Sequence, residues 1–169
     1  MDVTQGKLAV GYRCTSDDYP AMVLANLIFG GTSNSKLFMN VREKLSLCYY
    51  ASSSYARSKN ILTVSSGVET GDRDRALEEI DRQLKAVQRG DWEDWEQEGA
   101  LQAIRSSLLS LSDSQGALEN FYLGQIASGV HETPEELAAE LERVTKERIV
   151  AAAQTVHLDT VYFLGGREA

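Results

Sequence analysis

The chain has 169 residues, of which 43% are hydrophobic, so its size and composition fit one globular domain with a single core. Its 17 basic and 25 acidic side chains give a net charge of -8, which argues against nonspecific binding to nucleic acid or to an anionic membrane. No apolar run approaches the roughly 20 residues of a membrane-spanning helix, and no signal peptide precedes the first strand-like segment. We therefore expect a single domain over residues 1–169, in the cytoplasm, with no nucleic-acid or membrane partner.

The cysteines and histidines do not form a metal-binding pattern. Cys14 and Cys48 lack a CxxC spacing, and we expect a reduced intracellular pair, with one disulfide as the alternative. His131 and His157 lie 26 residues apart, and neither H-x-x-E-H nor H-E-x-x-H occurs. The sequence therefore predicts no metal site in this chain.

The first 45 residues predict one strand and two helices. Residues 5–14 place apolar side chains on one face at period two, which is typical of a strand. The apolar run 21–29 predicts a buried helix that Gly30–Gly31 ends. Ser33 or Asn34 is expected to cap the second helix.

Two further strands are expected over residues 48–57 and 61–69, joined by a hairpin connection at 58–60. Small polar side chains at 52–54 and 65–66 fit a tightly packed core poorly. They either line a wet cavity or occupy weakly buried strand positions, and the sequence leaves both open.

The second half predicts a block of helices followed by a last strand. The expected helix starts are Thr70, Asp91, Asp113 or Ser114, Thr133 and Thr145. Trp92 and Trp95 are expected in core or interface packing rather than as a ligand platform, and Thr160–Leu164 is the last strand. The order of elements predicts an α+β domain, in which a mostly antiparallel sheet packs helices on one face.

An arginine and a tyrosine seven residues apart carry the strongest chemical signal. Arg42 lies late in the second helix and Tyr49 starts the next strand, and both side chains donate hydrogen bonds that suit a developing oxyanion. The alternative is that Arg42 makes an ordinary salt bridge with Glu43 or Glu69, and that Tyr49 is a surface aromatic residue. Gly30–Gly31 has no phosphate-loop spacing, because no G-K-[ST] follows it.

The segments Gly30–Gly31, Ser35-Lys36-Leu37-Phe38 and Arg42-Glu43-Lys44-Leu45-Ser46-Leu47-Cys48-Tyr49 together resemble a signature of the pitrilysin/insulinase zinc peptidases, the inverzincins. They are similar to the repeat of those enzymes that does not hold the zinc. Three positions depart from the pattern: Lys36 stands where an arginine is common, Ser46 replaces a common glycine, and Cys48 replaces a small residue.

The resemblance implies a substrate-binding, oxyanion-supporting half of a zinc-dependent peptidase, excised from a longer chain. Arg42 and Tyr49 would hold the carbonyl of a peptide substrate, and Gly30, Gly31 and Ser33 would contact that substrate. Zinc would be supplied by a homologous zinc-bearing domain or subunit, so this chain alone is predicted to be inactive. The alternative is a noncatalytic scaffold or assembly domain that retains the peptidase fold.

Overall fold

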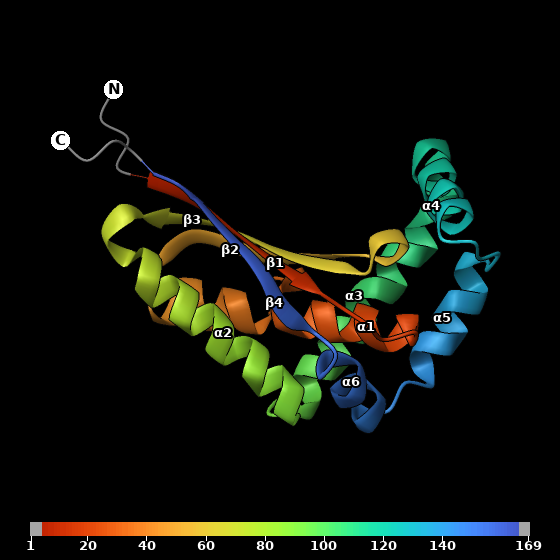
Figure 1. Ribbon diagram of the computed structural model, residues 1–169. Helices are drawn as coiled ribbons and strands as arrows, with labels where there is room; N and C mark the ends of the chain where they lie inside the picture. Colours follow the sequence, from red (N-terminus) through yellow and green to blue (C-terminus); the bar gives the residue numbers. More distant parts are fainter. Residues whose placement is uncertain (1–4, 166–169) are drawn as a thin grey trace.

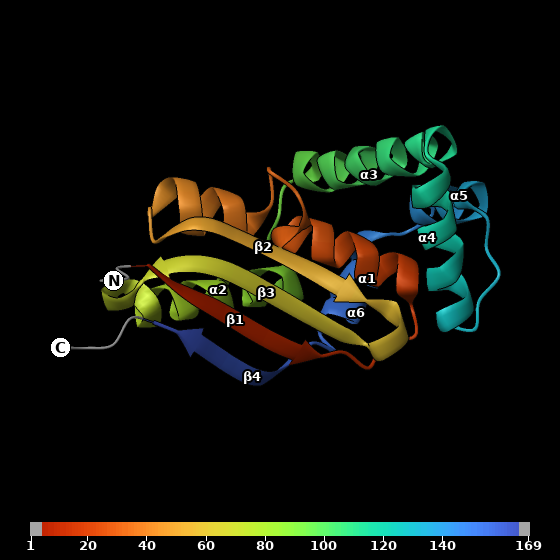
Figure 2. The same ribbon diagram turned by 90° about the horizontal axis from the view of Figure 1, so that it is seen from above.

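The computed structural model describes residues 5–165, in which four strands form one antiparallel sheet (Figure 1). The strands are β1 (Gln5–Arg13), β2 (Cys48–Ala56), β3 (Ile61–Glu69) and β4 (His157–Leu164), in the order β2-β3-β1-β4. Helices cover one face of this sheet, and the other face is left open (Figures 1 and 2). The expected α+β architecture is therefore confirmed.

Alternation along the strands separates a core face from the open face. Leu8, Val10 and Tyr12 of β1 are each at most 2% exposed and belong to the single hydrophobic core. Across the pairs Ala9↔Ser65 and Ser52↔Ser65, small exposed side chains lie on the open face. The small polar strand residues that the sequence left ambiguous thus divide between the two faces.

The serines on the core face are buried and hydrogen-bonded. The Ser53 hydroxyl donates to Oδ1 of Asn26 at 2.7 Å, and the Ser66 hydroxyl donates to the carbonyl of Tyr50 at 2.8 Å. These bonds satisfy polar groups that would otherwise be costly to bury.

The first two helical regions are more irregular than expected, and the first of them is longer. The α-helix α1 (Tyr19–Asn26) continues into a π-helical turn, η1 (Leu27–Gly31), so Gly30 lies inside the helical region instead of after it. A second π-helical segment, η2 (Leu37–Lys44), follows. The Ser35 hydroxyl accepts the Phe38 N–H at 3.4 Å, so the expected cap at Ser33 or Asn34 is wrong.

The remaining helical segments agree with most expected starts. They are η3 (Arg57–Lys59), η4 (Thr70–Asp72), α2 (Arg73–Arg89), α3 (Asp94–Leu109), η5 (Ser110–Asp113), α4 (Gln115–Ala127), α5 (Pro134–Glu142) and α6 (Lys146–Ala153). The side chains of Ser114, Thr133 and Thr145 cap α4, α5 and α6 as the sequence predicts. None of these described helices is both long and apolar enough to cross a lipid bilayer.

Two expectations near the ends of elements are wrong. Asp91 does not cap α3, because its carboxylate accepts a hydrogen bond from Arg89 at 2.8 Å and Glu93 forms the capping box instead. The last strand begins at His157 rather than at Thr160. Core packing holds for Trp92, which is 6% exposed, whereas Trp95 is 54% exposed.

Candidate substrate-binding site

Arg42 and Tyr49 line the same pocket, at the point where η2 gives way to β2. The pocket has a volume of about 440 Å³. Its lining residues are Arg42, Glu43, Ser46, Leu47, Cys48, Tyr49, Glu69 and Asp72. The two residues that the sequence singled out are therefore brought together, in the company of three carboxylates.

A β-bulge at the start of β2 places Tyr49 in this pocket. Cys48 pairs with Val68 and Tyr50 pairs with Gly67, so Tyr49 has no partner in the register of β3. Such an extra residue bends the strand and changes the direction of its side chain. As a result both Tyr49 and Tyr50 are exposed, at 54% and 43%, which strict alternation would not allow.

The neighbouring strand makes room for the second tyrosine. A Cβ atom at Gly67 would lie 2.7 Å from Cε1 of Tyr50, so only glycine leaves space for the ring on the open face. The bulge was not foreseen from the sequence, in which Cys48-Tyr49-Tyr50 reads as ordinary alternation; Gly67 inside a strand is the one available signal.

Arg42 and Tyr49 are held by acidic neighbours, but loosely. The Arg42 guanidinium stacks over the Phe38 ring, 4.6 Å from its centroid, and Nη1 lies 3.6 Å from Oε1 of Glu43. The Tyr49 hydroxyl donates to Oε1 of Glu69 at 3.3 Å. Both separations exceed those of strong hydrogen bonds. Arg42 therefore forms a salt bridge with Glu43, as the alternative interpretation of the sequence expected. This salt bridge lies in the pocket that Tyr49 also lines.

Cys48 lies on the buried side of the pocket and is not suited to act as a nucleophile. Burial raises the pKa of its thiol above the ordinary value, while a hydrogen bond with Ser66 and the charge of Arg42 act in the opposite direction. The thiol is therefore protonated at neutral pH. Cys14 and Cys48 are both buried and free, so the alternative of one disulfide is wrong.

Gly30, Gly31 and Ser33 are not among the residues that line this pocket. Gly30 is buried against β2, where a Cβ atom would lie 2.6 Å from Cδ1 of Leu37 and 2.7 Å from Oγ of Ser53. Gly31 and Ser33 are exposed. Gly30 thus permits the close approach of η1 to the sheet, and substrate contact by these three residues stays a prediction.

The residues that the structure describes do not fit a zinc site. Between residues 5 and 165, no three His, Cys, Asp or Glu side chains gather in a way that could hold a metal ion. His131 lies in the loop before α5 and His157 begins β4, and both are exposed. Metal chemistry is accordingly not assigned to any residue described in this chain.

Fold and pocket together define an α+β domain that presents hydrogen-bond donors at one end of an open sheet. The family model described as "Peptidase M16 inactive domain" matches residues 1–104, which is more than half of the 169 residues. The chain belongs to this family. The resemblance to the repeat of the zinc peptidases that does not hold the zinc is thereby confirmed.

Similar proteins extend well beyond the length of this chain. The "Probable inactive metalloprotease YmfF" of Bacillus subtilis (strain 168) is 42% identical over 171 residues, covering 99% of this chain and 40% of the relative. The "Uncharacterized zinc protease YmxG" of the same organism is 27% identical, covering 87% and 36%. The crystal structure of a conserved protein from Enterococcus faecalis V583 superposes with a TM-score of 0.89 at 33% identity, covering 99% and 40%. The chain thus spans about two fifths of the length of these relatives.

Proposed function

We propose that this domain is the substrate-binding, oxyanion-supporting half of a zinc-dependent peptidase, and that it acts on peptides together with a zinc-bearing domain or subunit. The observation that carries the proposal is the shared pocket of Arg42 and Tyr49. A guanidinium and a phenol both donate hydrogen bonds, and such donors stabilise the negative charge that forms on a peptide carbonyl oxygen during hydrolysis.

The loose contacts of the two donors support this role. Arg42 and Glu43 are separated by 3.6 Å, and 41% of the Arg42 side chain is exposed, so its N–H groups are accessible to a ligand. When the Tyr49 hydroxyl turns to a substrate, it gives up only a long hydrogen bond of 3.3 Å to Glu69. Because hydrogen bonds weaken with distance, an oxyanion of the substrate at ordinary hydrogen-bond distance would compete with this long bond to the Glu69 carboxylate.

The exposed apolar surface of the domain supports the proposal that a partner binds to it. Leu109, Tyr122, Leu123 and Ile126, which we call the α4 face, are between 41% and 74% exposed. Gln125 is the one buried residue of α4, although this helix is rich in apolar side chains. A groove of about 500 Å³ between α3, α4 and α5 continues this face. Exposed apolar surface of this kind marks an interaction site, and we assign it to the zinc-bearing half.

Substitutions in the complete assembly test the catalytic role. We expect Arg42→Ala and Tyr49→Phe each to lower the turnover of fluorescein-labelled casein roughly 100-fold or more, as the loss of one oxyanion donor typically does. The reaction is followed with and without a metal chelator, and thermal unfolding is measured in parallel. Because both side chains are about half exposed, the unfolding temperature should change little.

Lys44→Ala and Tyr162→Phe serve as matched controls, since Lys44 is exposed near Arg42 in sequence and Tyr162 is an exposed tyrosine of β4, away from the pocket and the α4 face. Both controls should retain turnover. Full turnover in Arg42→Ala and Tyr49→Phe would contradict the proposal.

A second candidate function is a noncatalytic scaffold domain. It is favoured by the higher identity to the relative described as a probable inactive metalloprotease, 42%, than to the one described as a zinc protease, 27%. A stable complex with the partner half that neither binds nor cleaves casein would establish this function instead.

A further inference from the structure

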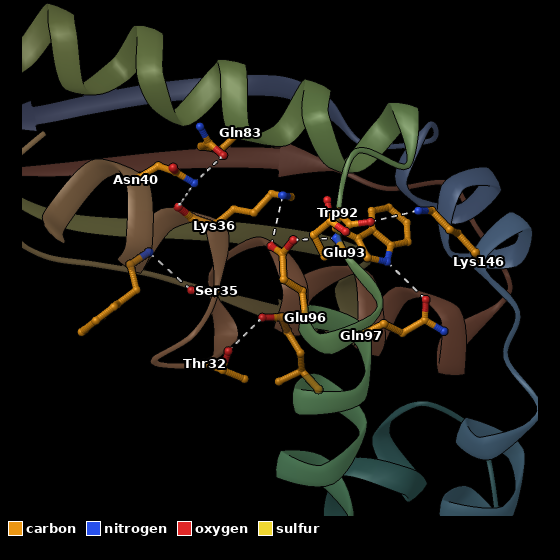
Figure 3. A network of polar contacts seen from close by, with 12 residues as sticks. Thr32, Ser35, Lys36, Asn40, Gln83, Trp92, Glu93, Glu96, Gln97 and Lys146 are labelled. Atoms are coloured by element: carbon orange, nitrogen blue, oxygen red, sulfur yellow. Dashed lines mark hydrogen bonds and ion pairs between the residues drawn. The ribbon is translucent and has the colours of Figure 1, made fainter. Parts of the chain in front are cut away.

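The start of η2 is joined to α3 by an ion pair that is almost completely buried. The Lys36 ammonium lies 3.1 Å from Oε1 of Glu96, and only 9% and 12% of the two side chains are exposed (Figure 3). The other carboxylate oxygen of Glu96 accepts the backbone N–H of Glu93 at 2.8 Å, which forms half of the capping box of α3. One carboxylate therefore neutralises Lys36 and also caps the first turn of α3.

The backbone of Lys36 belongs to a second polar chain, which leads to α2. Nδ2 of Asn40 donates to the Lys36 carbonyl at 3.0 Å and to Oε1 of Gln83 at 3.0 Å. Gln83 in turn donates to Glu79 at 2.6 Å, and both of these α2 side chains are buried. Lys36 thus connects η2 to α3 through its side chain and to α2 through its carbonyl.

The segment that carries Glu96 is itself fixed in place. Nζ of Lys146, on α6, donates to the carbonyl of Trp92 at 3.0 Å and lies 4.7 Å from the centroid of its ring (Figure 3). The indole N–H of Trp92 donates to Gln97 at 3.2 Å. The Glu96 carboxylate that pairs with Lys36 therefore lies in a segment that contacts outside η2 hold in place.

The winding of η2 links this anchor to the pocket. The Leu45 N–H donates to the carbonyl of Asn40, five residues earlier, at 3.2 Å, as π-helical winding requires. The direction of a side chain around a helix depends on the winding between it and the start of the helix. Relaxation of η2 to α-helical winding after Lys36 would rotate Arg42 about the helix axis and away from Tyr49.

We propose that Lys36, through its ion pair with Glu96, is a positioning residue that keeps η2 in this winding and directs Arg42 into the pocket. The inference rests on the proposed function. Buried ion pairs contribute little net stability, since well-packed apolar replacements are often neutral or stabilising. Orientation is the more direct consequence of an ion pair that joins two elements at a single point.

The same geometry accounts for lysine at a position where the family pattern has arginine. An ammonium is a compact charge that pairs with one carboxylate oxygen, while the planar fork of arginine favours both oxygens at once. Here the second oxygen of Glu96 is engaged by the Glu93 N–H. Lysine therefore leaves the cap of α3 undisturbed.

The double substitution K36M/E96L tests the inference, because it replaces the ion pair by apolar side chains of similar size. We expect hydrogen exchange of the amides of residues 37–44 to become about 10-fold faster or more, with exchange in α5 unchanged and the unfolding temperature within about 3 °C of wild type. In the complex with the zinc-bearing half, cleavage of fluorescein-labelled casein should fall by about 10-fold or more. E140L/R143M, which removes an exposed ion pair on α5, should change neither the exchange of residues 37–44 nor the cleavage rate.

Unchanged exchange across residues 37–44 in the double variant would overturn the inference. If K36M/E96L does not fold, Glu96→Gln replaces it, since the amide oxygen retains the acceptor for Glu93 but not the charge; faster exchange in η2 is again required. Arg42→Ala separates the two proposals. If it leaves casein cleavage unchanged, the proposed function fails, whereas lowered cleavage in Arg42→Ala but not in K36M/E96L rejects the positioning role alone.

Discussion

Ser46 connects η2 to β2 with a backbone φ of 51°, in the left-handed region that glycine adopts most easily. This explains physically why the family pattern has glycine at this position. An L-residue in this conformation costs roughly 1–2 kcal/mol, and the greater flexibility of glycine in the unfolded chain offsets about 0.5–1 kcal/mol of that. We therefore expect Ser46→Gly to raise the free energy of unfolding by about 0.5–1 kcal/mol, as measured by urea denaturation.

The control for this prediction is the same substitution inside a helix. Ser106 is an exposed residue of α3, and Ser106→Gly should lower the free energy of unfolding by about 0.5 kcal/mol. A Ser46→Gly variant that is destabilised to the same extent would show that the left-handed conformation costs serine nothing here.

Asp18 shows how one carboxylate joins two elements that are far apart in sequence. It caps α1 by accepting the Ala21 N–H at 3.2 Å, and it pairs with Arg148 of α6 through two hydrogen bonds of 2.9 Å. The hydrogen bonds from Arg148, followed by the one from Ala21, hold the pKa of the carboxyl below its usual value despite partial burial. A folded pKa below the unfolded one means that this stabilisation is present above the unfolded pKa of about 4 and is lost as the pH falls further.

The substitution Asp18→Asn should therefore lower the free energy of unfolding at neutral pH. It should also make this free energy depend less on pH in the acidic range. Asparagine also caps helices well, so the loss at pH 7 should be about 0.5–1 kcal/mol, which is the range of a partly exposed ion pair. The difference from wild type should shrink as the pH is lowered from about 4 to 2, as followed by urea unfolding. Asp17→Asn removes a neighbouring charge but leaves the pair of Asp18 with Arg148, so it serves as the control and should change the free energy of unfolding at pH 7 less than Asp18→Asn does.

At the scale of elements, local signals predicted more than long-range ones did. Three helix caps and the strand of Leu8, Val10 and Tyr12 follow from side-chain chemistry within a few residues, and they were found. The π-helical winding of η2 and the bulge at Tyr49 depend on contacts with α2, α3 and β3, which no periodicity contains. The sequence therefore singled out two residues that share a pocket, but it did not predict the geometry that brings them together.

At the scale of the whole molecule, the α4 face tests whether the domain has a partner. Glu135 and the ion pair of Arg105 with Glu142 (2.9 Å) line the groove that adjoins this face, and the chain has a net charge of -8, so a basic, apolar surface on the zinc-bearing half fits better than a second copy. We expect the double substitution L123S/I126S to weaken association with that half by about 10-fold or more, as measured by calorimetric titration.

Leu158→Ser, at an equally exposed position on β4, should leave the affinity unchanged. Equal affinities for wild type and the double variant would exclude the α4 face from the interface. If the wild-type chain dimerises and the double variant does not, the face binds a second copy instead.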